Sequence, residues 1–218
     1  MIPIRDEIRS GKFPLITISL IVANIAVFMY QLSLGGAEQY FIWKYAVVAK
    51  SLLTFQPLHP ASNLPPPVTL VTSQFLHGDI FHLGFNMLFL WIFGDNIEAK
   101  LGYLRFPLFY LGCGIISALV QVAVSPNAEV PMIGASGAIS GVMGAYFIRF
   151  PRAKVQTWVF FFFIIRLPAV IFLGLWLVLQ IVAGMPFYGS SEGGVAYFAH
   201  IGGFVTGMLA FNFVKKYN

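Results

Sequence analysis

The chain has 218 residues, of which 58% are hydrophobic and 10% are charged. An ordinary soluble domain carries about 25% charged residues, and about half of its surface must face water. A mean hydropathy of +0.81 therefore excludes a soluble globular protein and indicates a chain whose outer surface faces lipid. The net charge of +5 does not indicate nucleic-acid binding, because the basic residues lie in short runs beside apolar stretches, as in membrane loops.

Six apolar stretches approach the length of about 20 residues that a helix needs to cross a bilayer. The loop after the first stretch, residues 33–79, is long enough to be partly structured in the outer leaflet. We predict an all-α polytopic membrane protein, a six-helix bundle with a long first extracytoplasmic loop, that forms a single domain over residues 1–218. The predicted helices cover residues 14–32, 80–97, 104–124, 134–148, 167–183 and 196–214.

One further apolar run lies between the fourth and fifth predicted helices. Residues 155–165 are very apolar but too few to cross a membrane, so we expect an interfacial or re-entrant segment. If this run joined the fifth helix instead, Arg166 would lie within the bilayer at considerable cost. We therefore predict that this run is not one of the six membrane-spanning helices.

Lysine and arginine are distributed unevenly between the loops. Of the 13 Lys and Arg residues, only Lys44 and Lys50 lie in loops on one side of the predicted bundle. Because loops rich in Lys and Arg stay in the cytoplasm, we expect both termini to be cytoplasmic. An even number of helices also requires the termini to share one side. The compact form without additional domains leads us to expect a prokaryotic inner (plasma) membrane.

Polar residues occur in the first turns of three helices that run in the same direction. In this topology the second, fourth and sixth helices all run inwards from the outer face, so their first turns lie at similar depth. His82 and Asn86 share one face of the second helix, since they are four residues apart. Ser136 lies at the start of the fourth helix and His200 at the start of the sixth. Because unpartnered polar groups are costly in a membrane, we expect these side chains to face one another or a water-filled cavity.

A serine beside a histidine is a nucleophile beside a general base. An imidazole titrates near neutrality, so His200 can accept the proton of the Ser136 hydroxyl. Backbone N–H groups in the first turn of a helix have no intrahelical partner, and those of the fourth helix therefore suit a developing oxyanion. Asn86 and His82 can add side-chain donors to the same oxygen.

No carboxylate accompanies these residues at their depth. Asp95 lies nine residues beyond Asn86, about 13 Å deeper at the rise of an α-helix. Asp79 lies at the mouth of the second helix and is a weak candidate. We therefore predict a Ser–His dyad. No metal or cofactor is expected, because His82 and His200 lie on different helices without a carboxylate beside them.

Glycine recurs on one face of the fourth helix and after His200 on the sixth. Small-residue faces let membrane helices approach closely. We therefore expect the fourth and sixth helices to pack against each other. The glycines concerned are Gly134, Gly137, Gly141, Gly144, Gly203 and Gly207.

An ordered set of short motifs, each on its own predicted helix, resembles the rhomboid family of intramembrane serine proteases. Each motif alone is weak, but the ordered set is specific and extends from about Phe75 to the carboxyl end. The main motifs are His82-x-x-x-Asn86, Gly134-Ala135-Ser136-Gly137 and Ala199-His200-x-x-Gly203-x-x-x-Gly207. Further matches are Phe75-Leu76-His77, Gly94-x-x-x-Glu98, Leu101-Gly102 and Tyr110-x-Gly112.

The resemblance implies a rhomboid-like six-helix bundle whose active site lies towards the outer face. Ser136 would be the nucleophile and His200 the general base. His82, Asn86 and the backbone N–H of Ser136 would form the oxyanion hole. The implied activity is hydrolysis of peptide bonds in or next to transmembrane segments. The expected partners are therefore transmembrane protein substrates and membrane lipids, and not nucleic acid.

One position departs from the family pattern. Many members carry an aromatic residue one turn after the serine, where it packs on the catalytic histidine ring. This chain has Ser140 there, so the ring of His200 must be steadied by another group, and Met143 and Tyr146 are the candidates. His77 matches a family histidine and is expected to be structural or to organise water.

Two other functions are compatible with a polar cluster in a membrane bundle. A catalytically silent rhomboid-like binder of transmembrane helices would need neither Ser136 nor His200, so their presence argues against it. A transporter or channel would need ionisable groups that continue to the cytoplasmic side, whereas these residues lie only at outer depth. The sequence leaves the substrate and the oligomeric state open.

Overall fold

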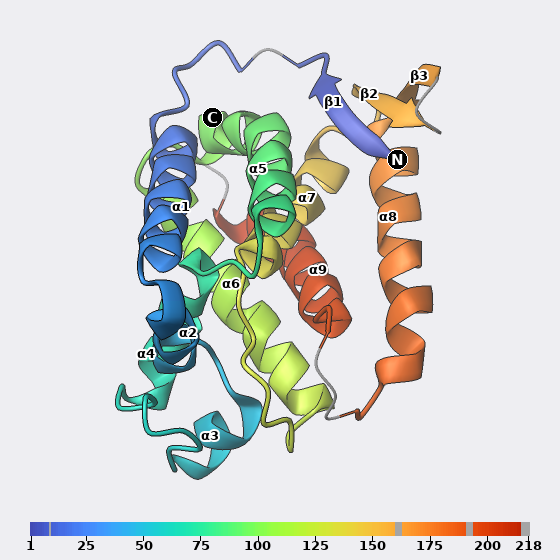
Figure 1. Ribbon diagram of the computed structural model, residues 1–218. Helices are drawn as coiled ribbons and strands as arrows, with labels where there is room; N and C mark the ends of the chain where they lie inside the picture. Colours follow the sequence, from blue (N-terminus) through green and yellow to red (C-terminus); the bar gives the residue numbers. More distant parts are fainter. Residues whose placement is uncertain (9, 160–162, 191–193, 215–218) are drawn as a thin grey trace.

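The computed structural model describes residues 1–8, 10–159, 163–190 and 194–214, and helices make up most of this part of the chain (Figure 1). Three basic residues that support cytoplasmic termini, Arg9, Lys215 and Lys216, lie outside the described residues. The longer helices are α1 (Leu15–Ser33), α5 (Ile80–Leu101), α6 (Arg105–Val124), α7 (Ser136–Arg149), α8 (Ala169–Gly184) and α9 (Tyr197–Val214).

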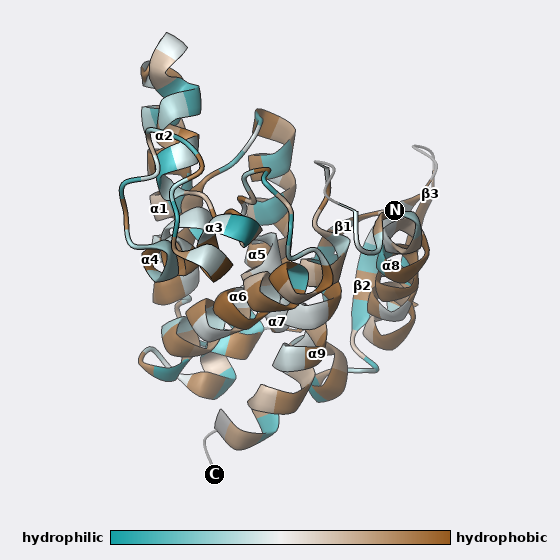
Figure 2. Cartoon of the chain, turned by 90° about the horizontal axis from the view of Figure 1, so that it is seen from below, coloured by the Kyte–Doolittle hydropathy of each residue, from teal (hydrophilic) through white to brown (hydrophobic). Residues whose placement is uncertain are grey.

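Four helical segments of the described chain are long and apolar enough to cross a membrane. In Figure 2, α6 and α8 are coloured mostly as hydrophobic, whereas the short helix α3 (Ala49–Thr54) has mixed colours. The chain is therefore a membrane protein with apolar helices, and the count of six spans stays a prediction. The four segments are Leu15–Ser33, Ile80–Leu101, Arg105–Val124 and Ala169–Phe187, the last of which includes the 3-10 turn η3 (Met185–Phe187).

The centre of the fold is α7, which has 14 residues and is therefore about 21 Å long. Every residue from Gly137 to Tyr146 is buried, because α5, α6 and α9 pack around this helix. A Cβ atom at Gly207 would overlap the carbonyl oxygen of Gly141, and one at Gly144 would overlap that of Phe204. The backbones of α7 and α9 are thus in direct contact, as the glycine spacing predicts.

The segment between α1 and α5 is structured by short elements. It contains α2 (Glu38–Tyr45), α3, α4 (Pro66–Thr72) and the 3-10 turns η1 (Gly35–Ala37) and η2 (Ser73–Phe75). Val47 forms an antiparallel bridge with Met132, on the strand-like stretch that leads into α7. This pairing attaches the segment to the loop that precedes Ser136.

A three-stranded antiparallel sheet corrects the prediction of an all-α chain. Strand β2 (Lys154–Val159) pairs with β1 (Ile2–Asp6) on one side and β3 (Phe163–Pro168) on the other. The predicted interfacial or re-entrant run 155–165 therefore forms most of a β-hairpin, and its residues 160–162 lie outside the described residues. Val155 and Thr157 are buried and their neighbours in β2 are not, which is the two-residue alternation of a strand.

The end of β1 attaches the sheet to the helices. The carboxylate of Asp6 accepts hydrogen bonds from Asn96 Nδ2 at 2.9 Å and from the Tyr146 hydroxyl at 2.5 Å. Burial raises the pKa of Asp6 to about 6. Asn96 belongs to α5 and Tyr146 to α7, so this carboxyl group joins three elements at the end of α7 opposite Ser136.

Candidate active site

Ser136 is the first residue of α7, and the backbone before it makes a sharp turn. Gly134 has a φ of +125°, a conformation that residues with a Cβ rarely adopt. A Cβ atom there would also lie only 2.8 Å from His82 Nε2. The N–H of Gly134 donates to the carbonyl of Ser73 at 2.9 Å. Glycine is therefore required at this turn, which brings Ser136 next to α5.

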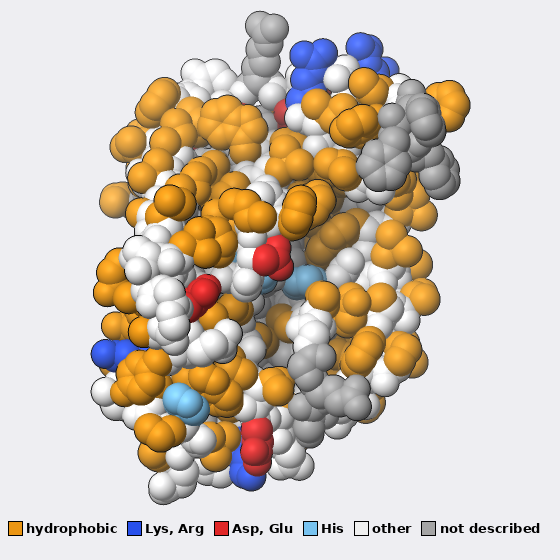
Figure 3. Space-filling model, in the orientation of Figure 1, with side chains coloured by type: hydrophobic (Ala, Val, Ile, Leu, Met, Phe, Trp, Pro, Cys, Tyr) orange, Lys and Arg blue, Asp and Glu red, His pale blue; other side chains and the backbone are white. Residues whose placement is uncertain are grey.

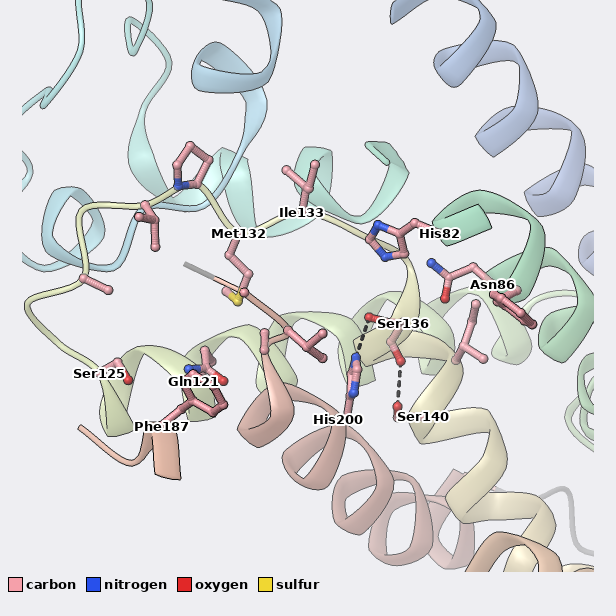
Figure 4. Close-up of a pocket in the computed structure, with 18 of the residues that line it drawn as sticks. His82, Asn86, Gln121, Ser125, Met132, Ile133, Ser136, Ser140, Phe187 and His200 are labelled. Atoms are coloured by element: carbon pink, nitrogen blue, oxygen red, sulfur yellow. Dashed lines mark hydrogen bonds between the residues drawn. The ribbon is translucent and has the colours of Figure 1, made fainter. Parts of the chain in front are cut away.

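His200 lies in the first turn of α9 and contacts the serine directly. Its Nε2 atom is 2.8 Å from Ser136 Oγ, and this interaction is drawn as a dashed line in Figure 4. The contact depends on the glycine-mediated approach of α7 and α9. The sequence therefore brings a hydroxyl and an imidazole together although 64 residues separate them.

His82 and Asn86 face the same region from α5 (Figure 4). Asp79 caps this helix, and its carboxylate accepts hydrogen bonds from the N–H groups of Phe81 and His82, each at 2.8 Å. Asn86 is buried, and within the described chain its Nδ2 atom has no hydrogen-bond partner. A buried donor without an acceptor is costly, so Asn86 is available to an oxygen atom that enters this site.

These side chains line a cavity of about 660 Å³. Figure 3 shows histidine inside a hollow on a face that is otherwise covered largely by hydrophobic side chains. The cavity can accommodate an apolar peptide segment beside a few polar groups. The polar groups on its wall include those of Ser136, His200, His82, Asn86, Gln121 and Ser125.

The partners of the His200 ring differ from those expected. Its Nδ1 atom lies 2.8 Å from Gln180 Oε1, and the ring of Trp176 lies 5.9 Å away between centroids, at an interplanar angle of 35°. Both residues belong to α8. The expectation for Tyr146 was wrong, because its hydroxyl donates to Asp6 at the other end of α7.

Met143 lines the cavity, but among the described interactions the ring of His200 contacts Gln180 and Trp176 instead. The hydroxyl of Ser140, which replaces the usual aromatic residue, donates to the carbonyl of Ser136 at 2.7 Å. A signal for Gln180 was present in the sequence: it is the one amide in the apolar stretch 169–184, and intramembrane polar residues usually have a function.

His77 lies behind His82, and the two rings make an edge-to-face contact at 5.0 Å. The side-chain amide of Gln31 holds the His77 backbone, donating to its carbonyl at 3.0 Å and accepting from its N–H at 3.1 Å. Burial lowers the pKa of His77 to about 4. His77 is thus a neutral, buried neighbour of the site, which fits the structural part of its expected role.

Comparison with known proteins identifies the family of this chain. The chain matches the Rhomboid domain family over residues 66–216 and is therefore a member of the rhomboid family. It is 29% identical over 205 residues to Rhomboid protein 1, mitochondrial, of Saccharomyces cerevisiae, covering 91% of this chain and 53% of the yeast protein.

Two further relatives show the same relationship. The chain is 31% identical over 139 residues to the presenilin-associated rhomboid-like protein, mitochondrial, of Homo sapiens, covering 62% of this chain and 33% of the human protein. It is 28% identical over 227 residues to RHOMBOID-like protein 6, mitochondrial, of Arabidopsis thaliana, with 88% and 66% covered. The chain thus spans from one third to two thirds of the length of these relatives.

Proposed function

We propose that this protein is an intramembrane serine endopeptidase that hydrolyses peptide bonds in or next to transmembrane segments of other membrane proteins. The observation that carries the proposal is the 2.8 Å contact between Ser136 Oγ and His200 Nε2 in the wall of a largely apolar cavity. Rhomboid proteins are generally intramembrane serine proteases, and family membership supports the same conclusion.

In the proposed reaction, Ser136 Oγ attacks the carbonyl carbon of the substrate peptide while its proton passes to His200 Nε2. The tetrahedral intermediate collapses, the C–N bond breaks, and the imidazolium returns its proton to the leaving amine. A water molecule then attacks the acyl-enzyme with His200 again as general base, which releases the carboxylic acid product and restores the serine hydroxyl.

The negative oxygen of the tetrahedral intermediate needs hydrogen-bond donors that are in position before the reaction. The backbone N–H of Ser136 is in the first turn of α7, where it has no intrahelical acceptor. The side chains of Asn86 and His82 lie on the same cavity wall, and the Asn86 amide is buried without a partner in the described chain. We assign these three groups to the oxyanion hole.

Substrate choice follows from the chemistry of a helix. The carbonyl groups of a transmembrane helix are already hydrogen-bonded, so a substrate must unwind locally before Ser136 can reach one. Glycine or proline near the scissile bond lowers the cost of unwinding, by about 1 kcal/mol for glycine and about 3 kcal/mol for proline relative to alanine. We therefore expect transmembrane substrates with such residues to be cleaved fastest.

The proposed orientation in the membrane rests on charge. The loops rich in Lys and Arg lie on the side of the termini and the sheet, so this side is assigned to the cytoplasm or its equivalent, with the active site towards the opposite face. Six spans would result if α7 and α9 also cross. The relatives named above are mitochondrial proteins, and their names lend no support to the expected prokaryotic plasma membrane.

Covalent labelling with a fluorophosphonate tests the proposal. Detergent-purified wild type is compared with Ser136→Ala and His200→Ala, and circular dichroism and gel filtration serve as folding controls. We expect labelling of the wild type alone, followed by cleavage of a transmembrane reporter. Folded wild-type protein that neither labels nor cleaves would contradict the proposal and would favour a silent binder of transmembrane helices.

A further inference from the structure

The ring of His200 is held from two sides by two different helices. Nε2 lies 2.8 Å from Ser136 Oγ of α7, and Nδ1 lies 2.8 Å from Gln180 Oε1 of α8. In a serine protease triad a carboxylate occupies the position of Gln180. The carboxylate of Asp79 also lines the cavity, but it accepts hydrogen bonds from the backbone of α5.

The orientation of the Gln180 amide follows from its second contact. Its Nε2 atom donates to the carbonyl oxygen of Trp176, one turn earlier in α8, at 3.5 Å. A backbone carbonyl can only accept, so the amide nitrogen must point towards Trp176 and the amide oxygen towards His200.

This orientation selects one form of the histidine. An amide oxygen has no proton to give, so the proton of the neutral imidazole must lie on Nδ1, from which it is donated to Gln180. Nε2 then carries the lone pair and faces the hydroxyl of Ser136. This is the tautomer that a general base needs, since only an unprotonated Nε2 can accept the serine proton.

We propose that Gln180 is a positioning residue that fixes the tautomer and ring orientation of His200, in place of the acid of a triad and of the aromatic residue that Ser140 replaces. This inference rests on the proposed peptidase function. Gln180 does not touch the reacting atoms, and it acts only through the imidazole. Trp176 assists by holding the amide through its carbonyl group and by covering the ring.

The variant Gln180→Met tests this role, because methionine has a similar length and shape but only a weak acceptor. General-base catalysis contributes about 100- to 10,000-fold, so we expect kcat to fall by about 10- to 100-fold with KM nearly unchanged. Gln180→Glu keeps an acceptor at the same place and should recover most of kcat. Val182→Ala, at an exposed position of the same helix, is the matched control and should leave kcat unchanged.

A second measurement does not depend on activity. In protein labelled with ¹⁵N at histidine, the His200 signals, assigned with His200→Ala, should show protonated Nδ1 and unprotonated Nε2 in the wild type. Gln180→Met should populate both tautomers. If the wild type proves unreactive towards fluorophosphonate, the peptidase proposal fails, and the tautomer measurement still decides the role of Gln180. Unchanged kcat or an unchanged tautomer in Gln180→Met would overturn the inference.

Discussion

Two of the helices that pack against α9, namely α7 and α8, contact it in different ways. In α7 the ten residues from Gly137 to Tyr146 are all buried, and its backbone touches that of α9 at glycines. In α8 only Ala169, Phe172, Leu173 and Gly184 are buried, and most of its exposed side chains are apolar. Ser136 and His200 therefore meet where the backbones of α7 and α9 are in contact. Gln180, which contacts the other nitrogen of His200, belongs to α8, and much of the surface of this helix is exposed.

This contrast suggests that the two sides of the site differ in function. On one side, α5, α7 and α9 carry the serine, the imidazole and the candidate oxyanion donors, and their close packing leaves little room for larger side chains. On the α8 side, one amide, that of Gln180, contacts the imidazole, and we propose that it sets the orientation of the ring. Substitutions on the first side should accordingly cost more than substitutions on the second.

The largest effect is expected at Asn86. Removing one oxyanion donor can cost up to about 1000-fold in kcat, so Asn86→Ala should lower turnover by about 10- to 1000-fold and leave the fold intact. Turnover of a transmembrane reporter is the measurement. Asn212→Ala, at the opposite end of α9 and exposed, is the control. Unchanged turnover in Asn86→Ala would refute its assignment to the oxyanion hole.

The next effect concerns the backbone contact between α7 and α9. In Gly207→Ala the added methyl group would overlap the carbonyl oxygen of Gly141, and neither backbone can move away freely. We expect the free energy of unfolding in detergent to fall by about 3 kcal/mol, the upper part of the range for overpacked cores. A variant as stable as the wild type would show that α7 and α9 are not in backbone contact.

A smaller effect, dependent on pH, is expected at the end of α7 opposite Ser136. Burial raises the pKa of Asp6 to about 6, so the folded protein binds this proton more tightly than the unfolded chain does. The resulting stabilisation is fully present below about pH 4 and is lost as the pH rises through about 6. Because Asp6 is partly solvated, we expect it to amount to about 1 kcal/mol.

Unfolding of the wild type and Asp6→Asn between pH 4 and pH 7 measures this contribution. The wild type should lose stability relative to the variant as the pH rises across this interval. A constant difference between the two proteins would show that Asp6 does not titrate in this interval.

The smallest effect is expected on α8. A Cβ atom at Gly174 would meet Phe147 Cε2 at 3.9 Å, an ordinary contact, so Gly174→Ala introduces no overlap. Alanine favours a helix over glycine by about 1 kcal/mol, and the variant should be as stable as the wild type or slightly more stable. It is the direct counterpart of Gly207→Ala, and equal losses in both would remove the distinction between the two helices.

The sequence by itself was sufficient for the features that depend on local composition. Apolar length identified the four long membrane helices, and the glycine spacing predicted the contact of α7 with α9. The depth argument also predicted that Ser136 and His200 approach each other, because helix direction and rise translate sequence position into position across the bundle. The catalytic roles of these residues remain proposals.

Only the tertiary structure decided which residues far apart in the sequence contact one another. Strand β2 pairs with β1 about 150 residues away, and the sheet escaped prediction because hydropathy registers the apolar run but not its pairing partner. That Gln180, and not Tyr146, contacts the His200 ring depends on how α8 is rotated against α9. The hydrophobic periodicity of one helix does not predict this rotation, because the rotation is set by the packing of side chains from both helices.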